Sequence, residues 1–494
     1  MNKYIILSLA ALVAGAAAAD ALTVSSQAGR LSSLVSDPTT VDNLVITGSV
    51  DASDLYFIDS EMPALKSLDL SGATIEAYSG KRINGLSVHK AGVVPAHSFT
   101  GSPIASVALP ATQSVTIGGA AFAGSAIESL SLGANIVAVE TGAFSNCASL
   151  ASLSVASDCL GEASFSNCTA LNDVNITKSV ALPAGIFGGC TALKCVNGSE
   201  NISAIGENAF AGCTSLSAFN FGGALTEISS GAFAASGLES VDLSACGALA
   251  SVGDWAFAKM PRLSSVNLGA AKALGQGVVF ECPSLKTFTY SSTATEVPDY
   301  AYTKNTAMDT TAMFNDDVQA IGRYAMSGMS QVQTITLPSA LASLGDGAME
   351  NMTSLRRVTL NAEAVPEIGK DVWKGVDQPS AMLVVPLSMV EAFREADGWK
   401  DFDIIGTSGV TDAENALTAA DIKARFDGDN LLIDFGSAEA SLVRLFDVQG
   451  RTLAGLENCS GMVSIDTADW STRYYIISAV MTDGRELSLK IARR

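Results

Sequence analysis

The sequence contains only two histidines, His89 and His97, among its 494 residues. Because histidine is the commonest proton-transfer group in enzymes, acid–base catalysis has few candidates here. The chain also lacks a G-x-S-x-G elbow, a P-loop, an H-E-x-x-H zinc motif and a G-x-G-x-x-G motif opening a helix. Glycosidase carboxylates cannot be recognised without a structure, since only their separation in space identifies them. These absences favour a protein that is not an enzyme, with no catalytic residue, metal ligand or cofactor assigned.

Charged residues are also scarce, at 16% of the chain, and basic residues are the rarer kind. Lys and Arg number 29 against 50 Asp and Glu, which gives a formal net charge of −21. An acidic chain repels nucleic acids and anionic membranes, so nucleic acid is excluded as an expected partner. Carboxylates can collect divalent cations, but no D-x-D-x-D-G calcium loop occurs, and solvated surface charge is the simpler interpretation.

Beyond the first residues the sequence has no long hydrophobic run, so no membrane span is expected. Lys3, the apolar stretch 4–13 and the small residues Ala17 to Ala19 have the order of a secretory signal peptide. The prediction is a signal peptide over residues 1–19, followed by a secreted or outer-surface protein.

An aromatic residue recurs with a spacing of 21 to 24 residues, at Phe99, Phe122, Phe144, Phe165, Phe187, Phe210, Phe233, Phe257 and Phe280. Tyr302, Met326, Met349 and Trp373 continue the same position. A unit this short cannot bury its own apolar face and must stack on its neighbours, which predicts a solenoid. The ring is assigned to the core of each coil.

Within a unit, a segment of the form L-x-x-L-x-L precedes an Ile/Val pair and a Gly-Ala-Phe turn, as in Ile127 to Leu150. Alternation of apolar and polar residues predicts one short strand, and the Ile/Val pair predicts a second. Met382 to Pro386 is expected as the last strand. A short helix at 390–396 is predicted next, with Trp399 and Phe402 covering the open end of the core.

Nine cysteines in an exported chain would ordinarily indicate disulfides. However, four of them lie three residues after the repeated ring, where other units carry Met260, Met329 and Met352. Exchange with Met indicates a buried apolar position, although neighbouring thiols would lie close enough for an occasional disulfide. With no C-x-x-C pair, zinc is disfavoured. The four are Cys147, Cys168, Cys190 and Cys213, whereas Cys159, Cys195, Cys246, Cys282 and Cys459 fall outside this register.

The unit Ile205 to Leu216, with its I-x-x-x-A-F-x-x-C-x-x-L pattern, resembles the BspA-like leucine-rich repeat family. This resemblance covers residues 60 to 405 and implies a bacterial surface or secreted protein whose partners are extracellular or host proteins. A second resemblance involves Leu445 to Arg451, the strand at 474–477 and the basic end at Arg493 and Arg494. These residues are similar to the C-terminal sorting domain of type IX secretion cargo, with Ser471 to Tyr474 replacing the usual G-x-Y. It implies a Bacteroidetes source.

The expected domain order therefore begins with the signal peptide, 1–19, and an N-terminal cap with irregular coils, 20–85. A β-rich leucine-rich-repeat solenoid with its C-terminal cap follows at 86–405, and then a linker at 406–421. The last part, 422–494, is expected to be a small all-β sandwich used for sorting or attachment, with five strands and hairpin turns at Gln449-Gly450 and Asp483-Gly484.

One set of polar residues faces solvent in the prediction, namely the outward positions of the L-x-x-L-x-L strands. Stacked coils would place them in rows on one sheet face, which provides a binding surface for an extracellular protein or a glycan. Ordinary solubility of an exposed strand face is the alternative, and a structural or assembly component of the bacterial surface is the alternative function. The oligomeric state stays open. The candidate binding residues are Asp173, Asn175, Asn220, Asp242, Asn267, Thr289, Thr336 and Arg357.

Overall fold

The computed structural model describes residues 21–156, 158–308, 314–407, 423–427, 429–447, 451–470, 474–482 and 486–492. The chain divides into two compact units, residues 1–201 and 202–494, and each is described by itself. The predicted signal peptide, both predicted hairpin turns and nearly all of the predicted linker lie outside the described residues. No helix in the described part is long and apolar enough to cross a bilayer.

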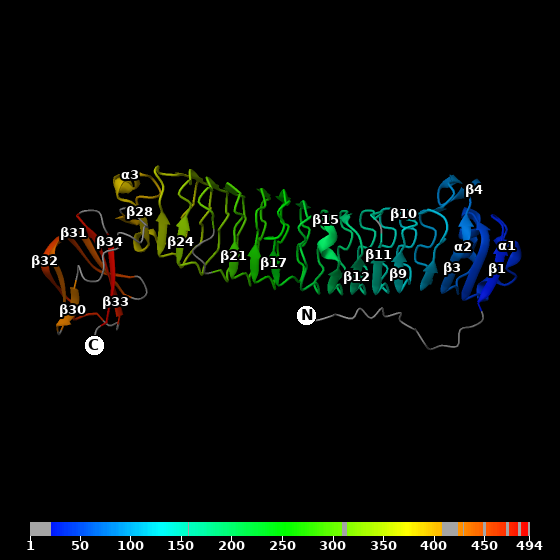
Figure 1. The fold of residues 1–494 in the computed structure, drawn as a ribbon, viewed down its shortest axis with the longest axis horizontal. Helices are drawn as coiled ribbons and strands as arrows, with labels where there is room; N and C mark the ends of the chain where they lie inside the picture. Colours follow the sequence, from blue (N-terminus) through cyan, green and yellow to red (C-terminus); the bar gives the residue numbers. More distant parts are fainter. Residues whose placement is uncertain are drawn as a thin grey trace, which may run out of the picture. The chain divides into compact units, whose positions relative to one another are not determined.

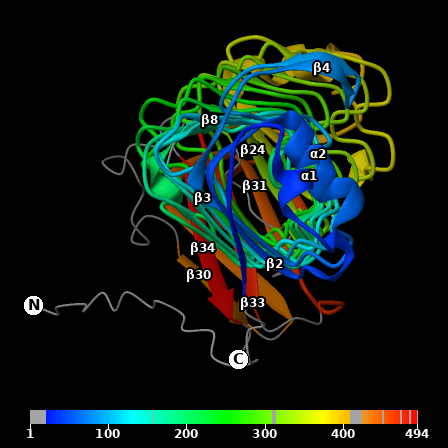
Figure 2. The same ribbon diagram turned by 90° about the vertical axis from the view of Figure 1, so that its right-hand side faces the viewer.

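The first unit begins with a cap of mixed structure (Figure 1). Buried Asp54 organises it, because its carboxylate accepts the backbone N–H groups of Gly29, Leu31 and Asp51 at 2.7 to 3.0 Å. Asp51 in turn accepts from the backbone of Ser53 and Asp54 and caps the second helix. Figure 2 shows both helices of the cap at the end of this unit. The elements of the cap are β1 (Leu22–Ser26), α1 (Leu31–Leu34), η1 (Pro38–Thr40), β2 (Asn43–Val50), α2 (Ala52–Glu61), β3 (Ser67–Ile75), β4 (Tyr78–Ile83) and β5 (Leu86–His89).

Regular coils follow the cap, each with one strand from the L-x-x-L-x-L segment and usually one from the Ile/Val pair. Parallel pairing joins β1-β2-β3-β7, β6-β8-β10 and β9-β11-β12-β14, whereas β4 and β5 form a separate antiparallel hairpin. The elements are β6 (Val93–Val94), β7 (Ser106–Ala108), β8 (Val115–Ile117), β9 (Ser129–Leu132), β10 (Ile136–Val139), β11 (Ser152–Val155), β12 (Asp173–Ile176), β13 (Val180–Leu182), β14 (Cys195–Asn197) and η2 (Ser199–Asn201).

The repeated turn is held from coil to coil by backbone hydrogen bonds at the ring position. The amides of Phe99, Phe122 and Phe144 donate to a carbonyl of the next coil at 2.7 to 2.8 Å. Two residues before each ring and two residues after it, the backbone adopts positive φ, as at Ala120 (51°) and Asn146 (60°). Glycine adopts this conformation freely, and the short side chain of Asn tolerates it, which explains the small residues around each ring.

The second unit repeats this architecture, and the predicted β-rich solenoid is confirmed. Its strands pair as β15-β16-β18-β20, β17-β19-β21, β22-β23-β25-β27 and β24-β26-β28-β29. The elements are β15 (Ile202–Ile205), β16 (Glu227–Ile228), β17 (Ser240–Asp242), β18 (Ser251–Val252), β19 (Ser265–Asn267), β20 (Ala273–Leu274), β21 (Thr287–Thr289), β22 (Glu296–Val297), β23 (Ala320–Ile321), β24 (Thr334–Leu337), β25 (Ser343–Leu344), β26 (Arg357–Leu360), β27 (Glu367–Ile368), η3 (Gln378–Ser380), β28 (Met382–Pro386), η4 (Leu387–Met389), α3 (Val390–Glu395) and β29 (Asp403–Thr407).

One predicted ring position is wrong. Phe280 lies at the surface, and the fully buried Val279 occupies the repeat position, because the Phe257 amide donates to Val278 and the Val279 amide to Ala301. With the register corrected, Cys282 falls in the buried thiol position, contrary to its predicted place. Its thiol donates to the Phe257 carbonyl at 3.1 Å, as Cys147 does to that of Phe122. All nine cysteines are free thiols.

The C-terminal end of the coils is closed as predicted, with one addition. Helix α3 forms, and the indole of buried Trp399 packs against Trp373 at 5.3 Å and donates to the Pro366 carbonyl at 3.2 Å. Phe402 covers Trp373 from another side at 4.9 Å. However, β28 is not the last strand, because β29 pairs with it in parallel and takes in Thr407, beyond the predicted end at 405.

The described residues between 423 and 492 form the predicted all-β region, but their strands make one antiparallel half-barrel sheet and not the two packed sheets of the predicted sandwich. The long strand β31 pairs with β32 along most of its length, with β30 near its start and with β33 near its end. A register shift between Asp434 and Glu439 interrupts β31, so two predicted strands are one bent strand. The bounds are β30 (Lys423–Asp427), β31 (Asn430–Asp447), β32 (Thr452–Asp466), β33 (Tyr474–Met481) and β34 (Glu486–Ala492).

Candidate functional site

The outward residues of the first unit form two registered rows across four parallel strands. Strand pairing aligns Ser129, Ser152, Asp173 and Cys195 in one row, and Ser131, Ser154, Asn175 and Asn197 in the other. The alternating Leu and Val residues of the same strands are buried, which fixes the outward direction of the rows. Two of the predicted residues, Asp173 and Asn175, therefore lie on one sheet face.

Asp173 is the only charged residue in these two rows, and its carboxylate is already engaged. The side-chain amide of Asn197 donates to Asp173 Oδ1 at 2.7 Å, and the exposed Cys195 thiol donates to the same atom at 3.7 Å. Burial first, and then the neighbouring Asp173 carboxylate, raises the pKa of the Cys195 thiol. The rows thus present mainly neutral hydrogen-bonding groups.

In the second unit, strands β17, β19 and β21 give a similar pair of rows. Asp242, Asn267 and Thr289 are aligned in one row, so three predicted residues from three coils lie side by side. Ser240, Ser265 and Thr287 form the row beside them. The spacing between strands in a sheet, about 4.8 Å, sets the distance between neighbours in a row.

Two of these side chains also have a local structural role. Asp242 Oδ1 accepts the backbone N–H of Ser244 at 3.0 Å, and Asn267 Oδ1 accepts that of Gly269 at 3.0 Å. Each therefore closes the turn that follows its strand, as Asp and Asn commonly do. The bond from Ser244 also lowers the pKa of the Asp242 carboxyl, because it favours the charged form. Structural capping explains part of the polar pattern without a ligand.

Of the remaining predicted residues, Thr336 and Arg357 lie in rows of the sheet, whereas Asn220 does not. Thr336 lies in a row with Thr359, and Arg357 lies in the neighbouring row with Thr334. The Arg357 guanidinium donates from Nε to Thr359 Oγ1 at 3.4 Å, so it bridges the two rows. Asn220 is exposed, but its segment is not a strand, and the structure does not align it with the rows.

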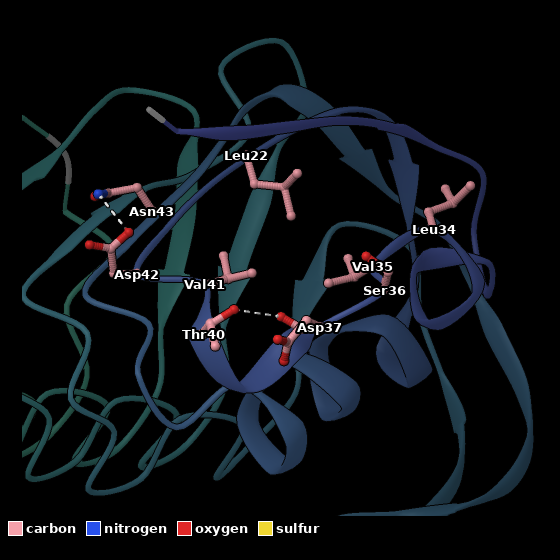
Figure 3. A pocket seen from close by; sticks show the side chains of 9 residues that line it. All are labelled: Leu22, Leu34, Val35, Ser36, Asp37, Thr40, Val41, Asp42 and Asn43. Atoms are coloured by element: carbon pink, nitrogen blue, oxygen red, sulfur yellow. Dashed lines mark hydrogen bonds between the residues drawn. The ribbon is translucent and has the colours of Figure 1, made fainter. Parts of the chain in front are cut away.

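The hollows of the described structure do not assemble a reaction centre. Figure 3 shows one in the cap, about 350 Å³, where Leu22, Val35 and Val41 point toward one another beside polar residues. Asp37 and Asp42 are its only ionisable groups, and Thr39 Oγ1 donates to Asp37 at 2.9 Å. A hollow of about 310 Å³ in the C-terminal sheet contains buried Asp447, whose carboxylate pairs with Arg451 Nε at 2.6 Å.

Neither histidine has the surroundings of a catalytic group. His89 is buried, with Nε2 3.2 Å from the carbonyl oxygen of Ile83, and His97 is exposed at a turn position with φ of 60°. Across the described ranges, no group of three or more His, Cys, Asp or Glu side chains is arranged to hold a metal ion.

A row of aromatic rings lies on the turns of the second unit. Trp255, Tyr300 and Tyr324 all occupy the position two residues before the core residue and are partly exposed. Tyr300 and Tyr324 stack on each other at 5.6 Å, and the Trp255 ring lies 2.1 Å from where a Cβ on Gly277 would be. Each ring therefore packs on a neighbouring ring or against the backbone of the next coil.

The prediction missed Cys195 and Asn197, which complete the rows of the first unit. Their strand follows Leu193 as L-x-x-V, but Gly198 replaces its last apolar residue. Only the first two apolar positions of the repeat, Leu193 and Val196, remain in the sequence to indicate this strand. The hairpin β4–β5 was also missed, although Asn84-Gly85 is a common two-residue hairpin turn.

Comparison with known proteins agrees with this architecture. The chain matches the model of the BspA type leucine-rich repeat region over residues 92–182, 180–309 and 304–379. Among curated proteins, none matches the sequence. A leucine-rich repeat protein from Bacteroides ovatus is similar in structure, with a TM-score of 0.51 and 16% identity over 78% of this chain and 92% of that protein. The pneumococcal vaccine antigen PcpA aligns with a TM-score of 0.34 and 13% identity, over 74% of this chain and 80% of the PcpA chain.

Proposed function

Because the chain belongs to the BspA-type leucine-rich repeat family, we propose that it is a cell-surface or secreted protein that binds an extracellular protein or glycan. The binding surface is the sheet face of the coils. The observation that carries this proposal is the alignment of exposed, mostly neutral polar residues in registered rows on neighbouring strands. The role is binding rather than catalysis.

The rows suit recognition for two physical reasons. A sheet is rigid, so its side chains lose little conformational freedom when a partner binds. Ser, Thr and Asn offer both donors and acceptors at regular spacing, and extended faces of this kind are common in solenoid proteins. The face of the first unit presents Ser131, Ser154 and Asn175 with no charge to desolvate in that row.

Export and attachment belong to the same proposal. Residues 1–19 direct secretion and are removed before Asp20, and residues 422–494 act as the sorting or attachment domain in a Bacteroidetes-type bacterium. The separate hydrophobic core of the C-terminal sheet, which includes Leu431, Val443 and Ile477, supports a distinct module. Intact-mass measurement of the exported protein tests a start at Asp20, and fractionation of a chain lacking residues 422–494 tests the sorting role.

The binding experiment is a screen of the full mature chain against extracellular-matrix proteins and a glycan array. For any saturable hit, Ser131→Arg with Asn175→Arg places two large cations on the sheet face and is expected to weaken binding at least tenfold. The matched control, Val137→Arg with Ala181→Arg, adds the same charge at exposed positions of the other strand set. Equal loss in both variants would reject the sheet face as the binding surface.

A folded protein without any hit would reject the proposal in favour of a structural role at the cell surface. Concentration-dependent, ordered self-association, followed by sedimentation velocity, is the readout for that role. The sheet-face variant then separates lateral packing through the rows from packing through another surface.

A further inference from the structure

The β4–β5 hairpin of the first unit departs from the repeat, because its two strands run antiparallel and belong to no coil sheet. Figure 1 shows the hairpin standing beyond the coils at the edge of this unit. Helix α2 packs against β4. Among the described residues, β5 pairs only with β4, which leaves one edge of β5 without a strand.

Internal contacts give the hairpin a defined shape. Its turn residues Asn84 and Gly85 both have positive φ, at 46° and 86°. The Asn84 side-chain amide donates to the Ala96 carbonyl at 2.8 Å and ties the tip to the neighbouring coil. The Arg82 guanidinium donates from Nε and Nη2 to the Gly85 carbonyl at 3.1 and 2.7 Å. An edge fixed in this way is ready to accept another strand at low entropic cost.

Two aliphatic side chains on this hairpin face solvent. Leu86 and Val88 are 59% and 63% exposed, and they lie two residues apart on one face of β5. The alternate residue His89 is buried on the other face. Natural proteins usually protect an edge strand with charge, proline or a bulge, but β5 presents none of these among residues 86–88.

The charge of the hairpin strands themselves is opposite to that of the whole chain. No Asp or Glu occurs between Glu76 and Glu128, although the chain has 50 acidic residues among 494. Lys81, Arg82 and Lys90 are all exposed. No ion pair within the described ranges involves any of these three cations. The hairpin segment, residues 77–90, thus carries three cations and no carboxylate on a protein of net charge −21, while Glu76 and the acidic residues of α2 lie next to it.

From this combination we propose that the hairpin docks an acidic, extended polypeptide segment of a partner protein, which adds as a strand to the free edge of β5. Backbone hydrogen bonds along β5 supply affinity, and Leu86 and Val88 contact apolar side chains of the partner. Lys81, Arg82 and Lys90 select for carboxylates and accelerate the encounter. The site is independent of the sheet-face rows.

A polypeptide fits these features better than a polyanionic glycan or a lipid surface does. A sulfated glycan has no peptide backbone that could pair with a free strand edge, and its sulfate groups gain nothing from contact with two aliphatic side chains. An anionic membrane would have to overcome repulsion from the remaining acidic chain, and two aliphatic side chains without an aromatic anchor give a small gain on insertion.

The test uses the full mature chain and a fluorescein-labelled peptide of seven alternating Glu and Val residues, followed by fluorescence anisotropy at low and physiological salt. The expected result is saturable binding at least tenfold tighter than for the matching Lys/Val peptide, weakening as salt rises. Leu86→Ser with Val88→Ser, and separately Lys81→Glu with Lys90→Glu, are each expected to weaken it at least tenfold.

Lys178→Glu with Lys194→Glu is the matched control, because it makes the same change in net charge at two exposed positions of the same unit. Thermal unfolding of each variant verifies the fold. Equal weakening by the control variant, or no binding of the acidic peptide, would overturn the proposal. Binding of a heparin oligosaccharide or of phosphatidylglycerol vesicles that is lost in the hairpin variants, with no peptide binding, would assign the hairpin to that ligand class and also overturn it.

Discussion

The core rings of the two units solve the same packing problem in different ways. In the first unit, Phe99, Phe122, Phe144, Phe165 and Phe187 stack nearly face to face, with centroids 5.1 to 6.1 Å apart. In the second unit, the stack runs from Phe210 through Phe233 to Phe257 at 5.1 and 5.6 Å and then ends at Val279. Tyr302, Met326, Met349 and Trp373 continue the position, all buried.

The difference shows that the position requires burial and volume, while a stacked ring is optional. The constant feature is the backbone: the amide at this position donates to the next coil whether the residue is Phe144, Val279 or Met326. Rings from a neighbouring segment also pack on the stack, since Phe219 and Phe221 contact the Phe233 ring at 5.1 and 5.6 Å.

The largest expected effect comes from deleting a stacked ring. Phe144→Ala removes a fully buried side chain between two coils, and we expect it to lower the free energy of unfolding by about 3 to 5 kcal/mol. Phe280→Ala is the matched control, because this ring is half-exposed, with Trp255 in a T-shaped contact and Lys304 over its face. Its expected cost is about 1 kcal/mol or less. Equal costs in urea titrations would reject the assignment of Val279 to the core position.

Adding a Cβ at the turn position two residues before the core residue is the next test. Gly142 and Gly277 both have positive φ, but a Cβ at Gly142 meets only Ser145 at 3.4 Å, whereas one at Gly277 would lie 2.1 Å from the Trp255 ring. Gly142→Ala is expected to cost about 1 kcal/mol through backbone strain alone. Gly277→Ala adds displacement of the indole and is expected to cost about 2 to 3 kcal/mol. Thermal unfolding compares the two, and a smaller cost at Gly277 would contradict the ring placement.

A smaller effect is expected from Asp59, an exposed residue at the edge of a hollow that Ile58, Met62 and Ile104 also line. Partial burial of its carboxyl raises its pKa to about 6. Since this value is above that of the unfolded chain, ionised Asp59 destabilises the fold above about pH 6, and the penalty disappears as pH falls toward 4. Asp59→Asn is therefore expected to raise stability at pH 8, by less than about 1 kcal/mol because the carboxylate still reaches water. A gain of the same size at pH 4 and pH 8 would contradict this origin.

Substitution of the cysteines is expected to have the smallest effect on the fold, and it compares two thiols of the first unit that differ in exposure. Cys195 is exposed, whereas Cys190 is fully buried and burial raises its pKa to about 12. Labelling the native protein with a disulfide reagent at pH 9 is expected to give a fast phase that Cys195→Ser removes and Cys190→Ser leaves unchanged. Loss of the fast phase in the Cys190 variant would show that the first unit opens locally on the labelling time scale.

Most of the architecture follows from short-range patterns in the sequence. The recurrence of Phe99 to Phe257 predicts the coils. The position three residues after the ring holds Cys147 in one unit and Met260 in another, and this alternation predicts that it is buried. Trp399 and Phe402 were predicted to close the core, and both are buried. Phe280 was misassigned because Val279 and Phe280 are adjacent and both apolar, and their hydrogen bonds to other coils decide which one points inward.

The candidate site was less predictable, because it depends on residues that are one coil apart in the sequence. Asp242, Asn267 and Thr289 form a row through strand register, and the turn-closing bonds of Asp242 and Asn267 became evident only with the backbone in place. Asn220 satisfies the same sequence pattern, yet its segment is not a strand.

The sequence by itself determined the repeating unit and most of its buried positions, because these depend on periodic apolar positions that each coil repeats locally. Only the tertiary structure decided which side chains share a row, which of two adjacent residues fills the core, and where an unpaired strand edge is left beside cations that form no ion pair in the described residues. The physical reason is that rows, core choice and open edges arise from pairing between segments distant along the chain, and local patterns do not fix that pairing.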